Sequence, residues 1–150
     1  MCLNIDNTKT CPKQVFHRWK ILTIDPQNGN ISSPCHDYIW KRPGLNFPHK
    51  SRVKNDPQSG FHVYTSKRDA QSAIKHWGIY YFYSPLGGHK TKLNFVLAKL
   101  KVFDFKASGK IERCDDYSDG RPGEIWRSAE IIDIIPFPIP TAEDIALSGF

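Results

Sequence analysis

The hydrophobic pattern of the chain is clearest at 60–64, where Phe61 and Val63 alternate with His62 and Tyr64. Alternation with a period of two residues is typical of a strand that has one buried face. We therefore predict a strand over 60–64.

A helix is predicted directly after this strand, over 66–77. Ser66 followed by Asp69 resembles a capping box, in which the hydroxyl accepts a hydrogen bond from a free amide of the first turn. Apolar residues then recur at helical spacing and form one face, which indicates packing against a sheet. These apolar residues are Ala70, Ala73, Ile74 and Trp77.

Several other stretches have the apolar content of strands, and they are separated by turn residues. The predicted strands are 15–24, 37–40, 78–83, 94–105 and 124–135. The segment 42–59 has no periodic pattern and contains three prolines, which predicts a long loop. The residues 107–110 are predicted to be a turn. The expected fold class is α+β: a single domain with a mixed or mostly antiparallel sheet of five or six strands, one main helix at 66–77 and long loops.

The length of 150 residues suits one domain with its own core. We predict a flexible arm at 1–14, the folded domain at 15–135 and a proline-rich tail at 136–150 that includes a short helix. No apolar run approaches the roughly 20 residues that span a bilayer, and the first residues lack the apolar core of a secretion signal. These features predict a cytoplasmic protein.

The cysteines show no pattern of a metal site or a disulfide framework. None of them forms a Cys-x-x-Cys pair, and such close pairs are the usual sign of a structural zinc site. We therefore expect reduced thiols and no bound metal. The four residues are Cys2, Cys11, Cys35 and Cys114.

The net charge of +6 arises from 21 Lys and Arg residues against 15 Asp and Glu residues. Much of this excess lies in 41–54, where the long loop is predicted. Such a basic segment is either a solvated loop or a surface that attracts an acidic partner. In the second interpretation the cations steer the encounter, and two aromatic residues serve as apolar anchors. The predicted partner-binding residues are Trp40, Lys41, Arg42, Phe47, Lys50, Arg52 and Lys54.

Short motifs in this order resemble those of small uncharacterised domains of phages and bacteria. The sequence at 60–64 matches the pattern GFH-x-[FY] and precedes a helix with Ser66 and Ala70. Ser33-Pro34 near the start and Ala129-Glu130-Ile131-Ile132 near the end extend the similarity over 17–135. Together with the basic, aromatic-bearing loop, this resemblance leads to the hypothesis of an interaction protein, for example a phage- or mobile-element-type inhibitor of a host system.

The same order is distantly similar to that of ADP-ribosyltransferase-like folds. In those folds a Gly-aromatic-x-aromatic strand precedes a Ser- and Ala-containing helix, and a later strand carries a catalytic Glu. This resemblance implies an NAD-dependent enzyme in which Tyr64 stacks on nicotinamide and Glu130 stabilises an oxocarbenium-like transition state. It also implies that His17, Arg18 and His62 lie beside the cofactor, although the first strand lacks the Gly of the family motif.

Three functions remain open from the sequence. The first is a small basic protein, without a cofactor, that binds an acidic surface of a host macromolecule, a protein in preference to a nucleic acid. The second is the NAD-using transferase centred on Tyr64 and Glu130. The third is a nucleic-acid-binding domain that uses the basic segment 41–54 and the tyrosines at 80, 81 and 83.

Overall fold

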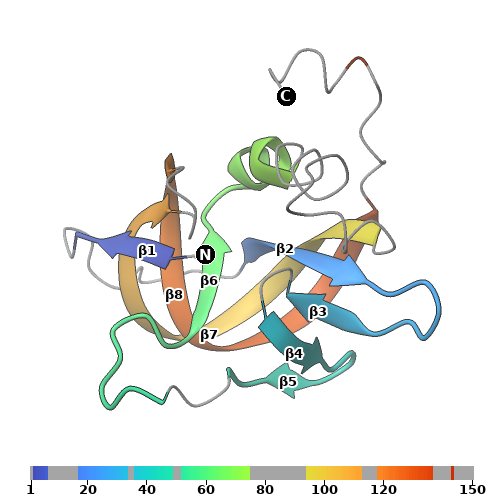
Figure 1. Ribbon diagram of the computed structural model, residues 1–150, viewed down its shortest axis with the longest axis horizontal. Helices are drawn as coiled ribbons and strands as arrows, with labels where there is room; N and C mark the ends of the chain where they lie inside the picture. The colour runs from blue at the N-terminus through green and yellow to red at the C-terminus, as the bar shows by residue number, and fades with distance from the viewer. Residues whose placement is uncertain are drawn as a thin grey trace.

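The computed structural model describes residues 2–6, 17–33, 36–48, 52–74, 94–112, 118–136 and 143. Within these residues the chain forms eight strands and a helix at 67–74 (Figure 1). The strands are β1 (Cys2–Ile5), β2 (Arg18–Ile24), β3 (Ile31–Ser33), β4 (His36–Trp40), β5 (Leu45–Asn46), β6 (Phe61–Tyr64), β7 (Asn94–Glu112) and β8 (Ser118–Pro136).

The strands form one sheet in the order β1-β7-β8-β6-β2-β3-β4, and β5 pairs with β8. Every pairing between the described strands is antiparallel. Because β2 pairs with β7 as well as with β6, the strands β2, β7, β8 and β6 form a closed ring. The prediction of a mostly antiparallel sheet is confirmed, but the predicted count of five or six strands is too low.

The two longest strands, β7 and β8, have 19 residues each and bend strongly as a pair (Figure 1). Their register shifts at three places, one of them between Phe105 and Ala107, and Asp104 has a positive φ of 63°. Register shifts of this kind bend a strand and increase its local twist. The turn predicted at 107–110 is therefore wrong, since this stretch continues β7 beyond the bend.

The prediction of a flexible arm at 1–14 is also wrong for its first residues, because Cys2–Ile5 forms β1 and pairs with β7. A side-chain β-carbon at Gly109 would collide with the carbonyl oxygen of Asn4, so the glycine permits the close approach of the two strands. The side-chain amide of Gln58 accepts from the Leu3 N–H through Oε1 at 2.9 Å and donates to the Leu3 carbonyl oxygen through Nε2 at 2.8 Å. These bonds occupy backbone groups of β1 and hold it in place.

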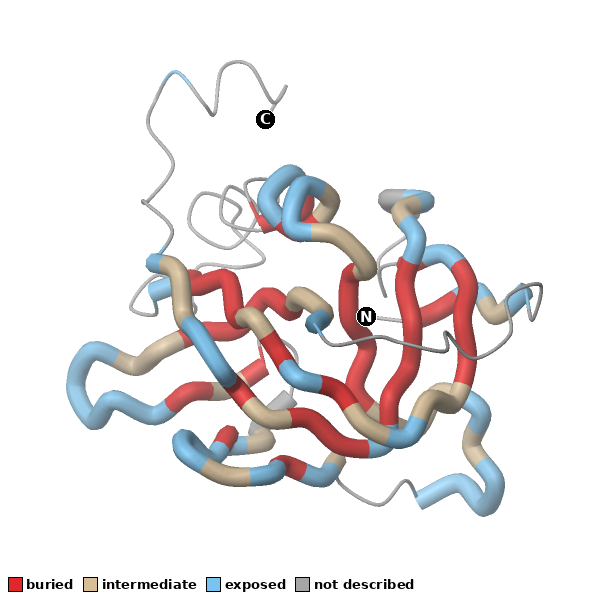
Figure 2. Tube along the Cα trace, turned by 180° about the vertical axis from the view of Figure 1, so that it is seen from behind, coloured by how far each residue is buried: buried red, intermediate tan, exposed pale blue. Residues whose placement is uncertain are grey.

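The sheet carries an apolar cluster on each face, and successive strand residues alternate between the two clusters. On β2, for example, Ile21 belongs to the first cluster and Leu22 to the second. Ala70, Ala73 and Ile74 of the helix complete the first cluster, as the apolar spacing predicted. Figure 2 shows buried stretches along the strands and an exposed outer side on the helix.

The described part of the helix confirms its predicted type and start. The Ser66 hydroxyl accepts a hydrogen bond from the Asp69 amide at 3.2 Å, which is the expected N-terminal cap. The end of the predicted helix, with Trp77, lies outside the described residues, as do the predicted strand at 78–83 and nearly all of the predicted tail.

Candidate functional site

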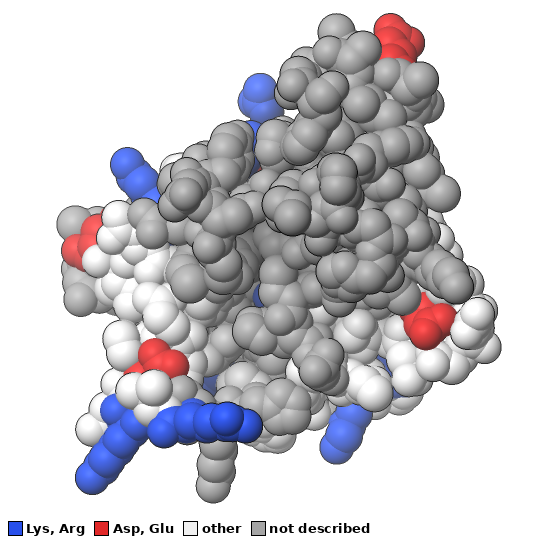
Figure 3. Space-filling model, viewed as in Figure 1, with Lys and Arg blue, Asp and Glu red and all other residues white. Residues whose placement is uncertain are grey.

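A cationic and apolar surface lies on the chain between β4 and β6. We define the β4–β6 surface by its exposed side chains, which are Lys41, Arg42, Leu45, Phe47, Arg52, Val53 and Lys54. In Figures 1 and 2 these segments follow the lower edge of the molecule, where Figure 2 shows mainly exposed chain. In Figure 3, Lys and Arg side chains project at the lower left, where the segment that precedes β6 lies.

One buried amide fixes the first half of this surface. The Asn46 side chain is 1% exposed, and its Oδ1 accepts from the Lys41 N–H at 2.7 Å and from the Tyr38 hydroxyl at 3.2 Å. Its Nδ2 donates to the carbonyl oxygens of Lys41 and Gly44 within the turn, and to that of Ala129 on β8. The turn that carries Lys41 and Arg42 is therefore closed on itself and tied to the sheet.

The Lys106 side chain fixes the second half of the β4–β6 surface. The Lys106 ammonium on β7 donates to the Asp56 carbonyl oxygen at 2.8 Å and to the Ser59 carbonyl and hydroxyl oxygens at 2.7 and 2.6 Å. Burial lowers the pKa of Lys106 below its ordinary value of 10.5; the nearby charge of Arg127 lowers it further, and Asp56 acts in the opposite direction. These bonds fix the end of the segment 52–59 that adjoins β6.

The lowered pKa predicts a pH dependence of stability. The folded state releases the Lys106 proton more readily than the unfolded chain does, so this group favours folding increasingly as pH rises through the lowered pKa towards 10.5. Between neutral pH and pH 10.5, urea unfolding should show the wild type gaining stability relative to Lys106→Met. The same comparison with Lys110→Met, an exposed residue of β7, serves as the control, and a pH-independent Lys106 difference contradicts the assignment.

The β4–β6 surface combines available charge with large apolar side chains. Phe47 and Val53 are 61% and 64% exposed. In the part of the chain that the structure describes, no carboxylate forms an ion pair with the side chains of Lys41, Arg42, Arg52 or Lys54. The sequence between 41 and 54 contains five Lys and Arg residues and no Asp or Glu.

Trp40 is not an exposed anchor, which corrects one predicted partner-binding residue. It is 4% exposed and packs on Phe61, with the ring centroids 4.4 Å apart. Its indole N–H donates to the Ser33 hydroxyl at 3.3 Å. The alternation along β4 directs this ring into the second cluster. Lys50, another predicted residue, lies outside the described residues.

The residues expected to hold NAD do not come together. Tyr64 is 1% exposed and belongs to the first core cluster, so no face of its ring is open to stack on nicotinamide. It pairs with Gly123 of β8, whereas Glu130 lies seven residues farther along that strand, beside Leu45. His62 is buried, and its Nε2 hydrogen-bonds the Gln58 carbonyl oxygen at 2.8 Å.

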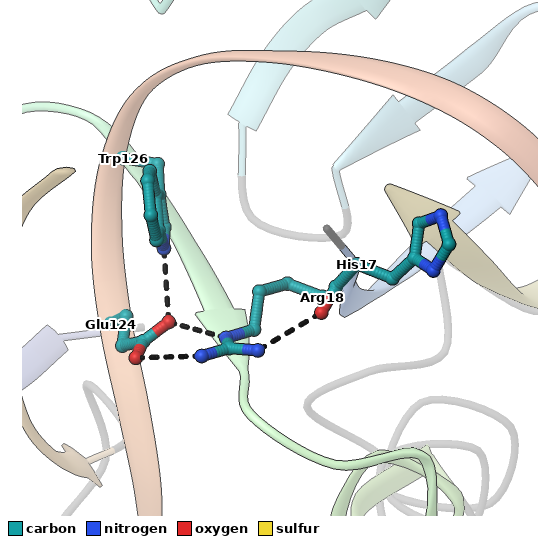
Figure 4. A network of polar contacts seen from close by, with 4 residues as sticks. All are labelled: His17, Arg18, Glu124 and Trp126. Atoms are coloured by element: carbon teal, nitrogen blue, oxygen red, sulfur yellow. Dashed lines mark hydrogen bonds and ion pairs between the residues drawn. The ribbon is translucent and has the colours of Figure 1, made fainter. Parts of the chain in front are cut away.

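A polar network missed from the sequence surrounds Arg18 (Figure 4). The Nε and Nη2 atoms of Arg18 donate to the two carboxylate oxygens of the buried Glu124 side chain. The bond from Nη2 is 3.1 Å long. The Trp126 indole donates to the same carboxylate at 3.0 Å. The His17 ring points away from the ion pair, and only its carbonyl oxygen takes part, by accepting from Arg18. No spacing in the sequence connects residues that lie 106 positions apart.

This network lies where the ring of strands closes. The strands β2 and β6 share a single pair in register, Trp19 with Tyr64. Beside it the Lys20 ammonium, itself buried, donates to the His62 carbonyl oxygen at 2.8 Å, and Arg18 reaches past β6 to β8. Side-chain bonds therefore join the ring where backbone pairing is short, which indicates a structural role for these charges.

In the described part of the chain, no group of three or more His, Cys, Asp or Glu side chains is arranged to hold a metal ion. None of the described helical residues forms a helix of the length and apolarity that crossing a membrane requires. Comparisons of the chain with protein-family models, curated proteins and solved structures found no match. Function is therefore inferred from the residues of this chain alone.

Proposed function

We propose that the protein is a small basic interaction protein whose β4–β6 surface binds an acidic surface of another macromolecule, a protein. One observation carries the proposal: exposed cations and an exposed Phe47 stand on a turn that the buried amide of Asn46 holds in one conformation. A segment that served only as a solvated connection would not need such a fixed arrangement.

The arrangement favours binding in three ways. Fixing the turn before contact reduces the conformational entropy that association costs. Cations without intramolecular carboxylate partners attract an acidic surface and raise the association rate. A large aromatic side chain surrounded by polar groups is the usual composition of an interface hot spot. Phe47 would fill an apolar pocket of the partner, and the cations would face carboxylates around it.

The biological form that we propose is a phage- or mobile-element-type inhibitor that acts on a host macromolecule. The order of short motifs along the chain supports this form. The transferase alternative receives no support from the positions of Tyr64 and Glu130, and the protein is proposed to act without NAD.

Charge reversal tests the proposal. The variant Lys41→Glu, Arg42→Glu, Arg52→Glu, Lys54→Glu should lose at least about tenfold in partner affinity, because it replaces four attractions by repulsions. Wild type and variant are immobilised, proteins captured from bacterial lysate are quantified by mass spectrometry, and the dissociation constant of the main partner is then measured.

A matched variant separates the surface from the overall charge. Reversal of Lys67, Arg68, Lys101 and Lys110, all exposed, also changes the net charge from +6 to −2, since each Lys or Arg to Glu change removes two charges. This control should keep the partner. Equal losses in the two variants, or undiminished capture by the first, would exclude the β4–β6 surface as the binding site.

A further inference from the structure

We propose that a second surface, built around Trp19, binds the phosphates and bases of a single-stranded nucleic acid. Two ammonium groups lie over the half-buried Trp19 ring: Lys67 Nζ is 5.5 Å and Lys99 Nζ is 5.9 Å from the ring centroid. Lys67 is the first residue of the helix, and Lys99 is the partner of Trp19 on β7. The helix, β2 and β7 thus converge on one aromatic ring.

A second pair of the same kind follows on β7. The Lys101 ammonium lies 5.5 Å from the centroid of the Phe103 ring. Ala98, Leu100 and Val102 all enter the second core cluster, so Lys99, Lys101 and Phe103 project from the opposite face of the strand. The ammonium-bearing positions 99 and 101 are about 7 Å apart along β7. We define the Trp19 surface as Trp19, Lys67, Lys99, Lys101 and Phe103.

The described residues leave the cations of this surface open to an anion. Among the described residues, no hydrogen-bond acceptor or ion-pair partner occupies the ammonium groups of Lys67, Lys99 or Lys101. Asp133 and Glu130 stand opposite Lys99 and Lys101 on β8, but neither forms an ion pair with them. The Asp133 carboxylate instead accepts from the Ile134 N–H at 2.9 Å.

The combination of rings and ammonium groups fits a nucleic acid better than an acidic peptide. Proteins that bind single strands combine cations, which contact phosphates, with aromatic rings, on which bases stack. A peptide carboxylate would use the ammonium groups of this surface but would make no specific use of the rings of Trp19 and Phe103. The Trp19 surface shares no residue with the β4–β6 surface, so the two sites are tested separately.

The test measures the anisotropy of a fluorescently labelled oligothymidylate with purified variants. Lys67→Glu/Lys99→Glu should weaken binding by at least about tenfold, whereas the matched Lys41→Glu/Arg52→Glu variant, also of net charge +2, should weaken it less than about threefold.

Lys67→Ala/Lys99→Ala should lower the salt slope of log K by about 1.4, the value for two lost phosphate contacts. Phe103→Leu, which keeps apolar volume, should weaken binding about fivefold through lost stacking.

Several results would overturn the proposal. Equal losses in the two charge-reversed pairs would show a general effect of net charge, and the absence of oligothymidylate binding by the wild type would exclude the site. Polyglutamate that competes as well as the oligonucleotide would assign the cations to an acidic peptide instead. If circular dichroism shows that Lys67→Glu/Lys99→Glu is unfolded, Lys67→Gln/Lys99→Gln replaces it. Capture of the protein partner is measured in the same variants and should persist in those of the Trp19 surface.

Discussion

Replacing Trp40 with alanine should lower the free energy of unfolding by about 3–5 kcal/mol, the usual cost of removing a large aromatic residue from a core. Trp40 packs on Phe61 and contacts Tyr38 edge to face at 5.8 Å between centroids. The truncation would leave a cavity between β4 and β6 and a Ser33 hydroxyl without its indole donor. Chemical denaturation followed by circular dichroism measures the loss.

Phe47→Ala is the matched comparison, because Phe47 is also aromatic and lies near Trp40 in the sequence. With 61% of the residue exposed, its truncation should change the free energy of unfolding by less than about 0.5 kcal/mol. Its effect should instead fall on partner affinity. If Phe47→Ala destabilised the protein as strongly as Trp40→Ala, the assignment of one ring to the core and the other to the surface would be wrong.

The second large effect is expected at Arg18. Arg18→Met should destabilise the protein by about 3–5 kcal/mol, because it leaves the Glu124 carboxylate buried without its cationic partner. The side chains of Arg18 and Glu124 are only 16% and 5% exposed, so water cannot replace the lost guanidinium at the carboxylate. Urea unfolding of wild type and variant gives the difference.

A double variant shows whether the cost comes from the uncompensated charge. In the Arg18→Met background, Glu124→Gln removes the charge and keeps an oxygen that accepts from the Trp126 indole. The double variant should therefore be more stable than Arg18→Met alone, since burial of an unpaired charge is avoided. Additive losses would instead indicate that the two residues contribute independently.

The local part of the fold could be predicted from the sequence. The strand at 61–64 and the capped start of the helix depend on neighbouring residues, and both are confirmed. The β1 strand could not be found in this way, because its four residues are stabilised by β7, which lies about a hundred positions away. The residues Ser108, Gly109 and Lys110 are of types that are common in turns. In the structure they instead continue β7 beyond its bend, and Gly109 permits the close approach of β1.

The candidate site was predictable in composition and not in arrangement. The cluster of cations at 41–54 is visible in the sequence, and its described members are exposed. Which aromatic residue faces solvent depends on the register of β4, which no local pattern determines, and the prediction that Trp40 is an exposed anchor is therefore wrong. The importance of Asn46 depends on its bonds to Lys41 and Ala129, and the Arg18–Glu124 pair depends on how the ring closes. These are tertiary relations without a local signal.

The pairing of β7 has a consequence for synthesis of the protein on the ribosome. Residues 2–5 and 18–24 are translated long before their partners on β7, which begin at position 94. Contacts between distant positions slow folding, because the intervening chain must lose entropy before any pairing compensates it. The nascent chain must therefore carry these segments without their β7 partners while the intervening residues are made, and the ring closes only once β7 and β8 have left the ribosomal tunnel.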